Sequence, residues 1–196
     1  MISADFELFC WINGLAGRLE LVDRLMAGLA NDYFVPVFLS LSMIWLWFAA
    51  QTSSQREQNQ KSVICAAISL GIANVVIQIF NKFYFRPRPF AEHTVSTVGQ
   101  LFYGPTDSSF PSNPAAVGFA IALAVWFGNK KSGAIMLILA FLFSFARVYV
   151  GVCYPLDIAG GAIIGGTISY LLAVIMRHIE PLPTRFLDLM KRVYLA

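Results

Sequence analysis

Apolar residues in this chain are gathered into long runs. Five runs stand out, at 33–50, 62–85, 115–127, 133–150 and 156–176. A bilayer-spanning helix needs about 20 mostly apolar residues, and only the run 115–127 is clearly short of that length. No alternation of period two competes with the runs, which favours helices over a β-barrel. The pattern predicts an all-α integral membrane protein.

Residues 6–31, ahead of the first run, mix charged and apolar side chains. The apolar positions recur at helical spacing, at Leu15, Leu19, Val22, Leu25, Met26 and Leu29. This spacing favours an amphipathic helix at the membrane interface, and the alternative is a sixth, tilted span. We therefore expect one membrane domain over residues 1–196, with a core of five to six transmembrane helices in 33–176 and a tail in 177–196.

Composition and charge narrow the possible functions. The chain is 58% hydrophobic and 13% charged, against about 45–50% and 25% in soluble domains. A net charge of +3 is weak for so apolar a chain, so we expect no nucleic-acid partner. The cysteines are odd in number and far apart, which predicts neither a disulfide framework nor a zinc site. The acidic start MISADFELF predicts no cleavable signal peptide.

Basic residues are concentrated in three polar segments, which are 51–61, the connection near 130 and the tail. With five alternating spans these segments fall on one side, and the positive-inside tendency makes that side cytoplasmic. The C-terminus is then cytoplasmic, while the connection 86–114 and the turn 151–155 face outward. We expect 51–61 to be a polar loop. We expect 86–114 to run along the surface without regular structure.

The outer side carries a first cluster of possible chemistry, in the sequence RPRPF. Arg86 and Arg88 are separated and followed by prolines, which stiffen the segment. Arginine at a membrane edge can snorkel toward lipid phosphates. Two rigidly held guanidinium groups can also bind phosphate oxygens in pairs. The pattern leaves both roles open.

A second cluster, SFPSNP at 109–114, directly precedes the third run. Ser112 or Asn113 is a good N-cap, and Pro114 suits the first helical turn. A helix start explains the cluster fully. It is also compatible with anion binding, because a helix N-terminus presents free N–H groups.

The third cluster, ARVYVGVCYPLD at 146–157, joins the last two runs. Arg147 and Asp157 lie at the membrane boundary, where burying a charge is costly without a partner or a function. They could form a structural ion pair with each other, or they could bind and orient a ligand.

The three clusters together resemble those of the type 2 phosphatidic acid phosphatase superfamily, and most of all the bacterial undecaprenyl-diphosphate phosphatases of the BcrC type. The likeness runs from INGLAGR at Ile12–Arg18 to the end of the fifth run. It implies a helical bundle in the bacterial cytoplasmic (inner) membrane that hydrolyses lipid phosphates at its outer edge, without a metal or other cofactor. On matching positions it assigns phosphate binding to Arg88, Ser112 and Arg147, with Arg86 at the rim.

Other positions depart from the family pattern, so that no catalytic set is intact. Pro114 stands where the family has a general-acid His and Cys153 where it has a nucleophilic His, whereas Asp157, which orients that His, is retained. The family Lys falls on Asn81, and Lys82 is displaced by one position, a rotation of about 100° on a helix. Possible auxiliary residues are Lys82, His93 in the outer loop, and Asn113, which stands where Gly or Asp is usual.

Chemistry decides what these departures imply. Proline has no titratable side chain, so Pro114 cannot protonate a leaving oxygen, and a general acid typically contributes about 10²–10⁴-fold. Cysteine can attack phosphorus as a thiolate, whose charge Arg147 would favour and Asp157 would oppose. The alternative for Cys153 is a small, buried apolar residue.

We therefore expect a catalytically impaired pseudo-phosphatase that keeps a lipid head-group pocket or serves as a structural subunit of a membrane complex. Its partners would be membrane lipids, phosphorylated head groups or other membrane-protein subunits. The first alternative is an active, metal-independent lipid phosphatase that uses Cys153 or His93. The second alternative is a lipid transporter.

Overall fold

The computed structural model describes residues 2–50, 52–92 and 106–192. In this part of the chain the only regular secondary structure is α-helix. The helices are α1 (Ile2–Asn13), α2 (Glu20–Ala30), α3 (Phe34–Phe48), α4 (Ser53–Phe83), α5 (Pro89–Glu92), α6 (Asn113–Gly128), α7 (Lys130–Tyr149), α8 (Pro155–His178) and α9 (Leu182–Arg192).

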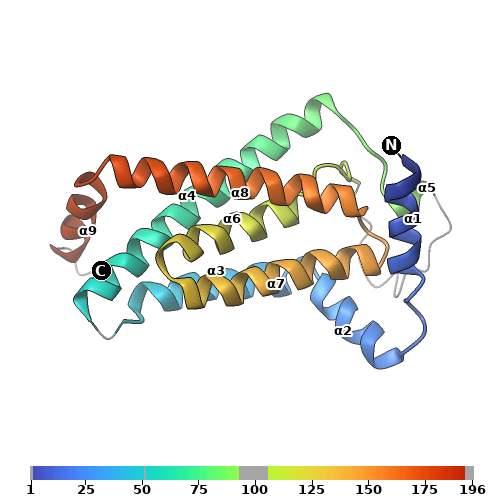
Figure 1. The fold of residues 1–196 in the computed structure, drawn as a ribbon, viewed down its shortest axis with the longest axis horizontal. Helices are drawn as coiled ribbons and strands as arrows, with labels where there is room; N and C mark the ends of the chain where they lie inside the picture. The colour runs from blue at the N-terminus through green and yellow to red at the C-terminus, as the bar shows by residue number, and fades with distance from the viewer. Residues whose placement is uncertain (1, 51, 93–105, 193–196) are drawn as a thin grey trace.

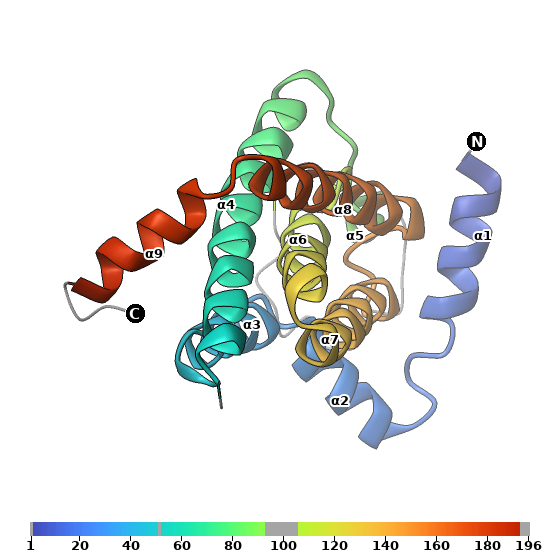
Figure 2. The same cartoon turned by 60° about the vertical axis from the view of Figure 1, so that its left-hand side comes forward.

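The long helices form a bundle whose axis is horizontal in Figure 1. Helices α1, α2 and α5 lie at one end, and α9 lies at the other. In Figure 2, α6 is enclosed by α4, α7 and α8, and its contacts with these three helices are the most extensive in the molecule. Helix α6 is therefore the centre of the core.

Small residues allow α6 to take this central place. Its sequence is rich in Ala and Gly, and most of these residues are buried. On α8, a Cβ added at Gly161 would lie 2.3 Å from the carbonyl oxygen of Ser112, and one added at Gly165 would lie 2.1 Å from that of Ala116. Close approach of helix backbones through small residues is typical of membrane proteins. It fixes the start of α6 against the start of α8.

The expected all-α membrane fold is confirmed. Each of the five apolar runs forms a helix, and α4, α7 and α8 are each long and apolar enough to span a bilayer. Helices α2 and α3 meet the same criteria as a pair, although they are bent by 58° at the break between them. Helix α6 has 16 residues, as its short apolar run predicts. By length and composition, the described residues thus contain three or four candidate spans.

The N-terminal region differs from the predicted single helix over 6–31. The chain breaks after Asn13, and α2 starts at Glu20. Gly17 has φ +83°, which favours glycine, and its N–H donates to both carboxylate oxygens of Asp23 at 3.2 Å. The turn therefore ends the first helix, and the spacing of apolar residues continues across it.

Two polar segments are more helical than predicted. Residues 51–61 are not a loop, because α4 begins at Ser53, where the Thr52 side chain caps it by accepting from Gln55 N–H at 3.3 Å. The tail contains α9, whose Leu187 is fully buried. Within 86–114, the described residues include the short helix α5 and the first two residues of α6, and they are otherwise irregular.

Candidate active site

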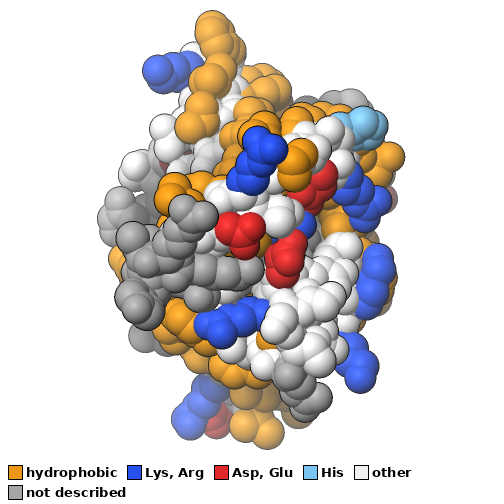
Figure 3. All heavy atoms as spheres, turned by 90° about the vertical axis from the view of Figure 1, so that its left-hand side faces the viewer, with side chains coloured by type: hydrophobic (Ala, Val, Ile, Leu, Met, Phe, Trp, Pro, Cys, Tyr) orange, Lys and Arg blue, Asp and Glu red, His pale blue; other side chains and the backbone are white. Residues whose placement is uncertain are grey.

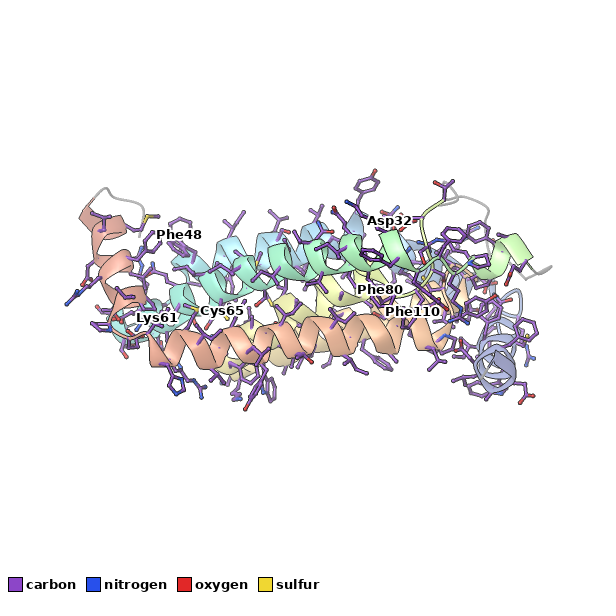
Figure 4. All side chains as sticks on the ribbon, turned by 90° about the horizontal axis from the view of Figure 1, so that it is seen from above. Asp32, Phe48, Lys61, Cys65, Phe80 and Phe110 are labelled. Carbon is purple, nitrogen blue, oxygen red and sulfur yellow. The ribbon has the colours of Figure 1, made fainter. Side chains whose placement is uncertain are left out.

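The three sequence clusters meet at the end of the bundle that also holds α1 and the break between α2 and α3. The end of α7, the start of α8 and the loops on either side of 93–105 all contribute to this site end. Figure 4 shows Asp32, Phe80 and Phe110 at this end and Lys61, Cys65 and Phe48 at the other. The fold therefore brings together residues that are far apart in sequence.

Asp157, in the first turn of α8, is the most connected carboxylate of the site end and has no exposed surface. It accepts hydrogen bonds from Arg86 Nη1 at 2.6 Å, from Tyr154 N–H at 2.8 Å and from the Ser109 hydroxyl. Its own backbone carbonyl accepts from Ser112 N–H at 3.0 Å. Asp157 thus ties the RPRPF segment, the start of α6 and the turn before α8 to one another.

Arg86 is held on both sides by carboxylates. Its Nη2 donates to Asp5 of α1 at 2.7 Å, and its guanidinium lies 4.0 Å above the centre of the Tyr154 ring. Burial acts to lower the pKa of Arg86, but its contacts with Asp5 and Asp157 outweigh burial and raise that pKa. Burial also raises the pKa of Tyr154 to about 12, and Glu92 adds to this effect. Arg86 remains charged and Tyr154 neutral at physiological pH.

Arg88 is buried beside the Cys153 thiol. Its Nη1 lies 3.5 Å from Cys153 Sγ and 3.2 Å from the carbonyl oxygen of Val152. The other edge of the guanidinium contacts Asp107, with Nη2 donating to the carboxylate at 2.9 Å and Nε to the backbone carbonyl at 3.2 Å. Arg88 therefore joins the turn before α8 to the loop before α6.

Arg147, in the last turn of α7, approaches the same sulfur. Its guanidinium interacts electrostatically with Cys153 and forms an ion pair with Asp32, which lies between α2 and α3. Nη1 also donates to the carbonyl oxygen of Ala30 at 3.4 Å, while the buried Nε has no hydrogen-bond partner among the described residues. The Cys153 side chain, 1% exposed, thus lies beside two buried guanidinium groups.

The second cluster acts mainly as a helix start. Ser112 is the N-cap of α6, with its side chain accepting from Ala115 N–H at 3.5 Å, and Pro114 lies in the first turn. Asn113 Nδ2 donates to Asn74 of α4 at 3.2 Å. Ser112 is buried and linked to Asp157, but its hydroxyl is used in capping.

The auxiliary residues are placed as follows. Lys82 is exposed near the end of α4 and has no ion pair with the described residues of the site. The buried Oδ1 atoms of Asn81 and Asn113 have no hydrogen-bond partner in the described chain. His93 lies outside the described residues. The described part of the chain contains no group of three or more His, Cys, Asp or Glu that could hold a metal ion.

One alternative for Arg147 and Asp157 is wrong, because they do not pair with each other. Asp157 turns inward to cap the start of α8 and binds Arg86, and Arg147 binds Asp32 instead. Three further carboxylates of the site, those of Asp5, Asp32 and Asp107, were not predicted from the sequence. The available signal was the presence of isolated acids beside apolar segments, where an unpaired charge is costly.

Known proteins resemble this chain over nearly its full length. The undecaprenyl-diphosphatase BcrC of Bacillus subtilis is 34% identical over 98% of this chain and 92% of its own length. An undecaprenyl-diphosphatase of Sulfolobus acidocaldarius is 34% identical over 87% of this chain and 77% of its own. The crystal structure of Aquifex aeolicus LpxE has 27% identity and a TM-score of 0.67, covering 85% of this chain and 93% of that one.

These relatives correct the functional expectation. The hypothesis of a catalytically impaired pseudo-phosphatase is wrong, because the relatives with this degree of similarity are named as diphosphatases. It relied on the absence of proton-transfer groups from the sequence clusters, and the alternative of an active lipid phosphatase is the better supported one. The model of the PAP2 superfamily matches residues 62–180, which hold most of α4, all of α6 to α8 and the buried arginines, so this multi-pass membrane protein belongs to the PAP2 superfamily.

Proposed function

We propose that this protein is a lipid-diphosphate phosphatase that removes the terminal phosphate of a polyprenyl diphosphate such as undecaprenyl diphosphate. The names and coverage of the relatives support this substrate class. The observation that carries the chemical part of the proposal is the position of Cys153 Sγ beside the guanidinium groups of Arg88 and Arg147.

Cys153 is the proposed nucleophile. Its thiolate attacks the terminal phosphorus, so that a P–S bond forms as the bond from phosphorus to the bridging oxygen breaks. The electron pair of that bond leaves with the bridging oxygen, and polyprenyl monophosphate is released. Water then attacks the phosphocysteine, the P–S bond breaks, and orthophosphate and a proton leave as the thiolate is restored.

Arg88 and Arg147 bind the oxygens of the transferred phosphoryl group. Both are buried, and buried donors that are aimed in advance stabilise developing charge more strongly than donors in water. Arg86 has a different role in this proposal, because the two carboxylates that bind its guanidinium, Asp5 and Asp157, are both buried and belong to the framework of the site. Asp157 accepts from Tyr154 N–H and thereby fixes the turn that follows Cys153.

The leaving group explains how turnover proceeds without a general acid at Pro114. When a diphosphate is hydrolysed, the leaving group is a phosphate monoester. The second pKa of such a phosphate is about 6, so this leaving group does not need to be protonated as it departs. An alkoxide leaving from a lipid monophosphate needs a proton, and the missing general acid would cost about 10²–10⁴-fold. The site therefore favours diphosphates over monophosphate esters such as phosphatidic acid.

The proposed orientation places the site end on the outer face of the membrane. Lys and Arg side chains lie around the edge of the opposite end, which Figure 3 views directly. Positive charge of this kind marks the cytoplasmic side.

The test is orthophosphate release by the purified protein in detergent micelles, with undecaprenyl diphosphate as substrate. We expect Cys153→Ser to lower turnover by about 10³-fold or more, because an alcohol at the same place is a far weaker nucleophile at neutral pH. Cys65→Ser is the matched control, since Cys65 is also buried but lies in α4 at the opposite end. It should retain the activity of the parent protein.

Three results would decide against parts of the proposal. A parent protein that releases no orthophosphate overturns the function. Full activity in Cys153→Ser, with loss in His93→Ala, would move the nucleophile to the outer loop. Equal rates on undecaprenyl diphosphate and phosphatidic acid would contradict the argument from the leaving group.

A further inference from the structure

The two guanidinium groups beside Cys153 are already occupied by carboxylates. Arg88 pairs with Asp107, and Arg147 pairs with Asp32. The two carboxylate side chains are 55% and 46% exposed, whereas the two arginine side chains are almost fully buried. Each ion pair therefore has an inner cation that does not reach solvent and an outer anion that does.

The charge balance of the site end is unusual for an anion-binding site. The guanidinium groups of Arg86, Arg88 and Arg147 face four carboxylates, those of Asp5, Asp32, Asp107 and Asp157. Asp5 and Asp157 bind Arg86 and are buried, so they belong to the framework of the site. Asp32 and Asp107 are the two carboxylates that occupy the arginines next to the sulfur.

A phosphoryl group cannot reach Cys153 while both carboxylates hold these positions. Cys153 is 1% exposed, and the solvent-exposed partners of its two arginines are Asp32 and Asp107. The unpartnered Nε of Arg147 indicates that this guanidinium has a free donor for one more oxygen. A phosphoryl group has enough oxygens to replace both carboxylates and to satisfy that donor as well.

We propose that Asp32 and Asp107 are positioning residues that compete with phosphate for Arg147 and Arg88. In this mechanism, which rests on the proposed function, the substrate displaces both carboxylates on binding. After hydrolysis they return to the arginines and expel orthophosphate. Two buried arginines without such competitors would hold the product tightly, since a competing closed state reduces apparent affinity in proportion to its population.

The segments that carry the two carboxylates are suited to such movement. Asp107 lies in the irregular stretch that precedes α6, and Asp32 lies at the 58° break between α2 and α3. Figure 4 shows Asp32 at the margin of the bundle rather than between the long helices. Neither side chain needs a core helix to move in order to leave its arginine.

The test uses Asp32→Asn, Asp107→Asn and the double variant of the full-length protein. Asparagine can still accept a hydrogen bond from arginine but lacks the charge, so the fold is retained and competition is weakened. We expect each single variant to bind orthophosphate about tenfold more tightly, by calorimetry or competition with orthovanadate. In steady-state turnover, kcat and KM should both fall and kcat/KM should not, because product release becomes slower.

Glu20→Gln is the matched control. Glu20 forms an ion pair with Arg24 on the surface of α2, so this variant also removes one negative charge that neutralises an arginine. It should leave orthophosphate affinity unchanged. A tenfold gain in this variant would mean that net charge alone causes the effect, and it would overturn the proposal.

Two other outcomes would also overturn it. Unchanged orthophosphate affinity in Asp107→Asn, the variant in the exposed loop, would show that this carboxylate does not compete. A variant in which a phosphocysteine accumulates while orthophosphate affinity is unchanged would make the carboxylate a base for water. Orthophosphate binding can be measured without turnover. If the parent protein hydrolyses nothing but Asp32→Asn or Asp107→Asn binds orthophosphate more tightly, the proposed function is refuted and the competition between carboxylate and phosphate is not.

Discussion

At the end of the bundle that holds Cys153, the partly or fully buried cations Arg86, Arg88 and Arg147 each have at least one carboxylate partner. At the opposite end most of the cations are lysines or exposed arginines. There Lys130 and Lys131 are exposed, and the Lys61 side chain is 27% exposed beside Glu57 and Glu180. The same kinds of charge therefore meet very different surroundings at the two ends.

The two ends differ in how much stability is lost when one partner of an ion pair is removed. A buried ion pair contributes little net stability relative to apolar residues, but removing one partner leaves an uncompensated charge in a medium of low dielectric constant. An exposed pair is screened by water and salt. The site end is thus a network in which each member depends on the others, whereas the exposed charges of the opposite end tolerate change.

Asp157→Ala should produce the largest difference between the two ends. It removes the shared acceptor of Arg86, Ser109 and Tyr154 N–H, and we expect a loss of about 3–5 kcal/mol in the free energy of unfolding. Lys61→Ala at the opposite end should cost less than about 1 kcal/mol. Unfolding in detergent, followed by helical circular dichroism, measures both.

Equal losses in these two variants would break the comparison. They would mean that Asp5 alone can neutralise Arg86 after Asp157 is removed, and that the site end is no more interdependent than an exposed surface. The double variant Asp5→Asn/Asp157→Asn tests this directly, because it leaves Arg86 without either carboxylate.

Glycine substitutions give a second comparison. At Gly161 an added Cβ would meet the backbone oxygen of Ser112 at 2.3 Å, and at Gly128 it would meet the Ser62 hydroxyl at 1.7 Å. Backbone cannot rotate away, so Gly161→Ala should cost about 2–3 kcal/mol and lower phosphatase activity by displacing Ser112. In Gly128→Ala, rotation of the Ser62 side chain relieves the clash. This rotation breaks the hydrogen bond from Ser62 to the Gln58 carbonyl, which costs about 1 kcal/mol.

Thermal unfolding of the two alanine variants gives the order of the effects. The shorter distance at Gly128 alone would suggest a larger loss of stability in Gly128→Ala. That result would contradict the argument that the cost depends on whether the clashing group can move away. Gly71→Ala is the control, since nothing lies within 4 Å of its added Cβ. It should be neutral or slightly stabilising, because alanine is favoured over glycine in helices.

The sequence predicts the fold well for a physical reason. Long apolar runs have few alternatives to helices in a membrane, and each of the five runs forms a helix. The N-cap Ser112 and the arginines were also recognisable, because their residue types serve few purposes at a membrane edge. The partners of these arginines could not be predicted. Asp5 and Arg86 are far apart in sequence, and only the packing of α1 at the end of the bundle brings them together.

The chemical error has a related origin. Motif comparison at Cys153 and Pro114 considers one position at a time, whereas the reactivity of a thiol depends on the groups around it. No pattern in the sequence places Arg88 and Arg147 beside the same sulfur. That convergence arises from the turn between α7 and α8, which begins where α7 ends, two residues after Arg147, and is held by the capping carboxylate of Asp157 in the first turn of α8.

The smallest expected effect concerns pH at the opposite end. Glu180 has a lowered pKa because Lys61, and then Thr184, donate hydrogen bonds to its carboxylate. A lowered folded-state pKa contributes stability that is present above the usual pKa of 4.5 and is lost as the pH falls through the folded-state value. The docking of α9 on α4 should therefore loosen in acid. A spin label on α9 at Leu189→Cys, in a background without other cysteines, would report this as faster motion.

Glu180→Gln should remove most of this pH dependence and make the label slightly more mobile at neutral pH. The effect is small because the carboxylate is exposed and because Glu57 also contacts both Lys61 and Thr184, so one acceptor remains when the other is lost. Buried Leu187 continues to hold the helix. Complete release of α9 in Glu180→Gln would contradict this redundancy and would make the opposite end as interdependent as the site end.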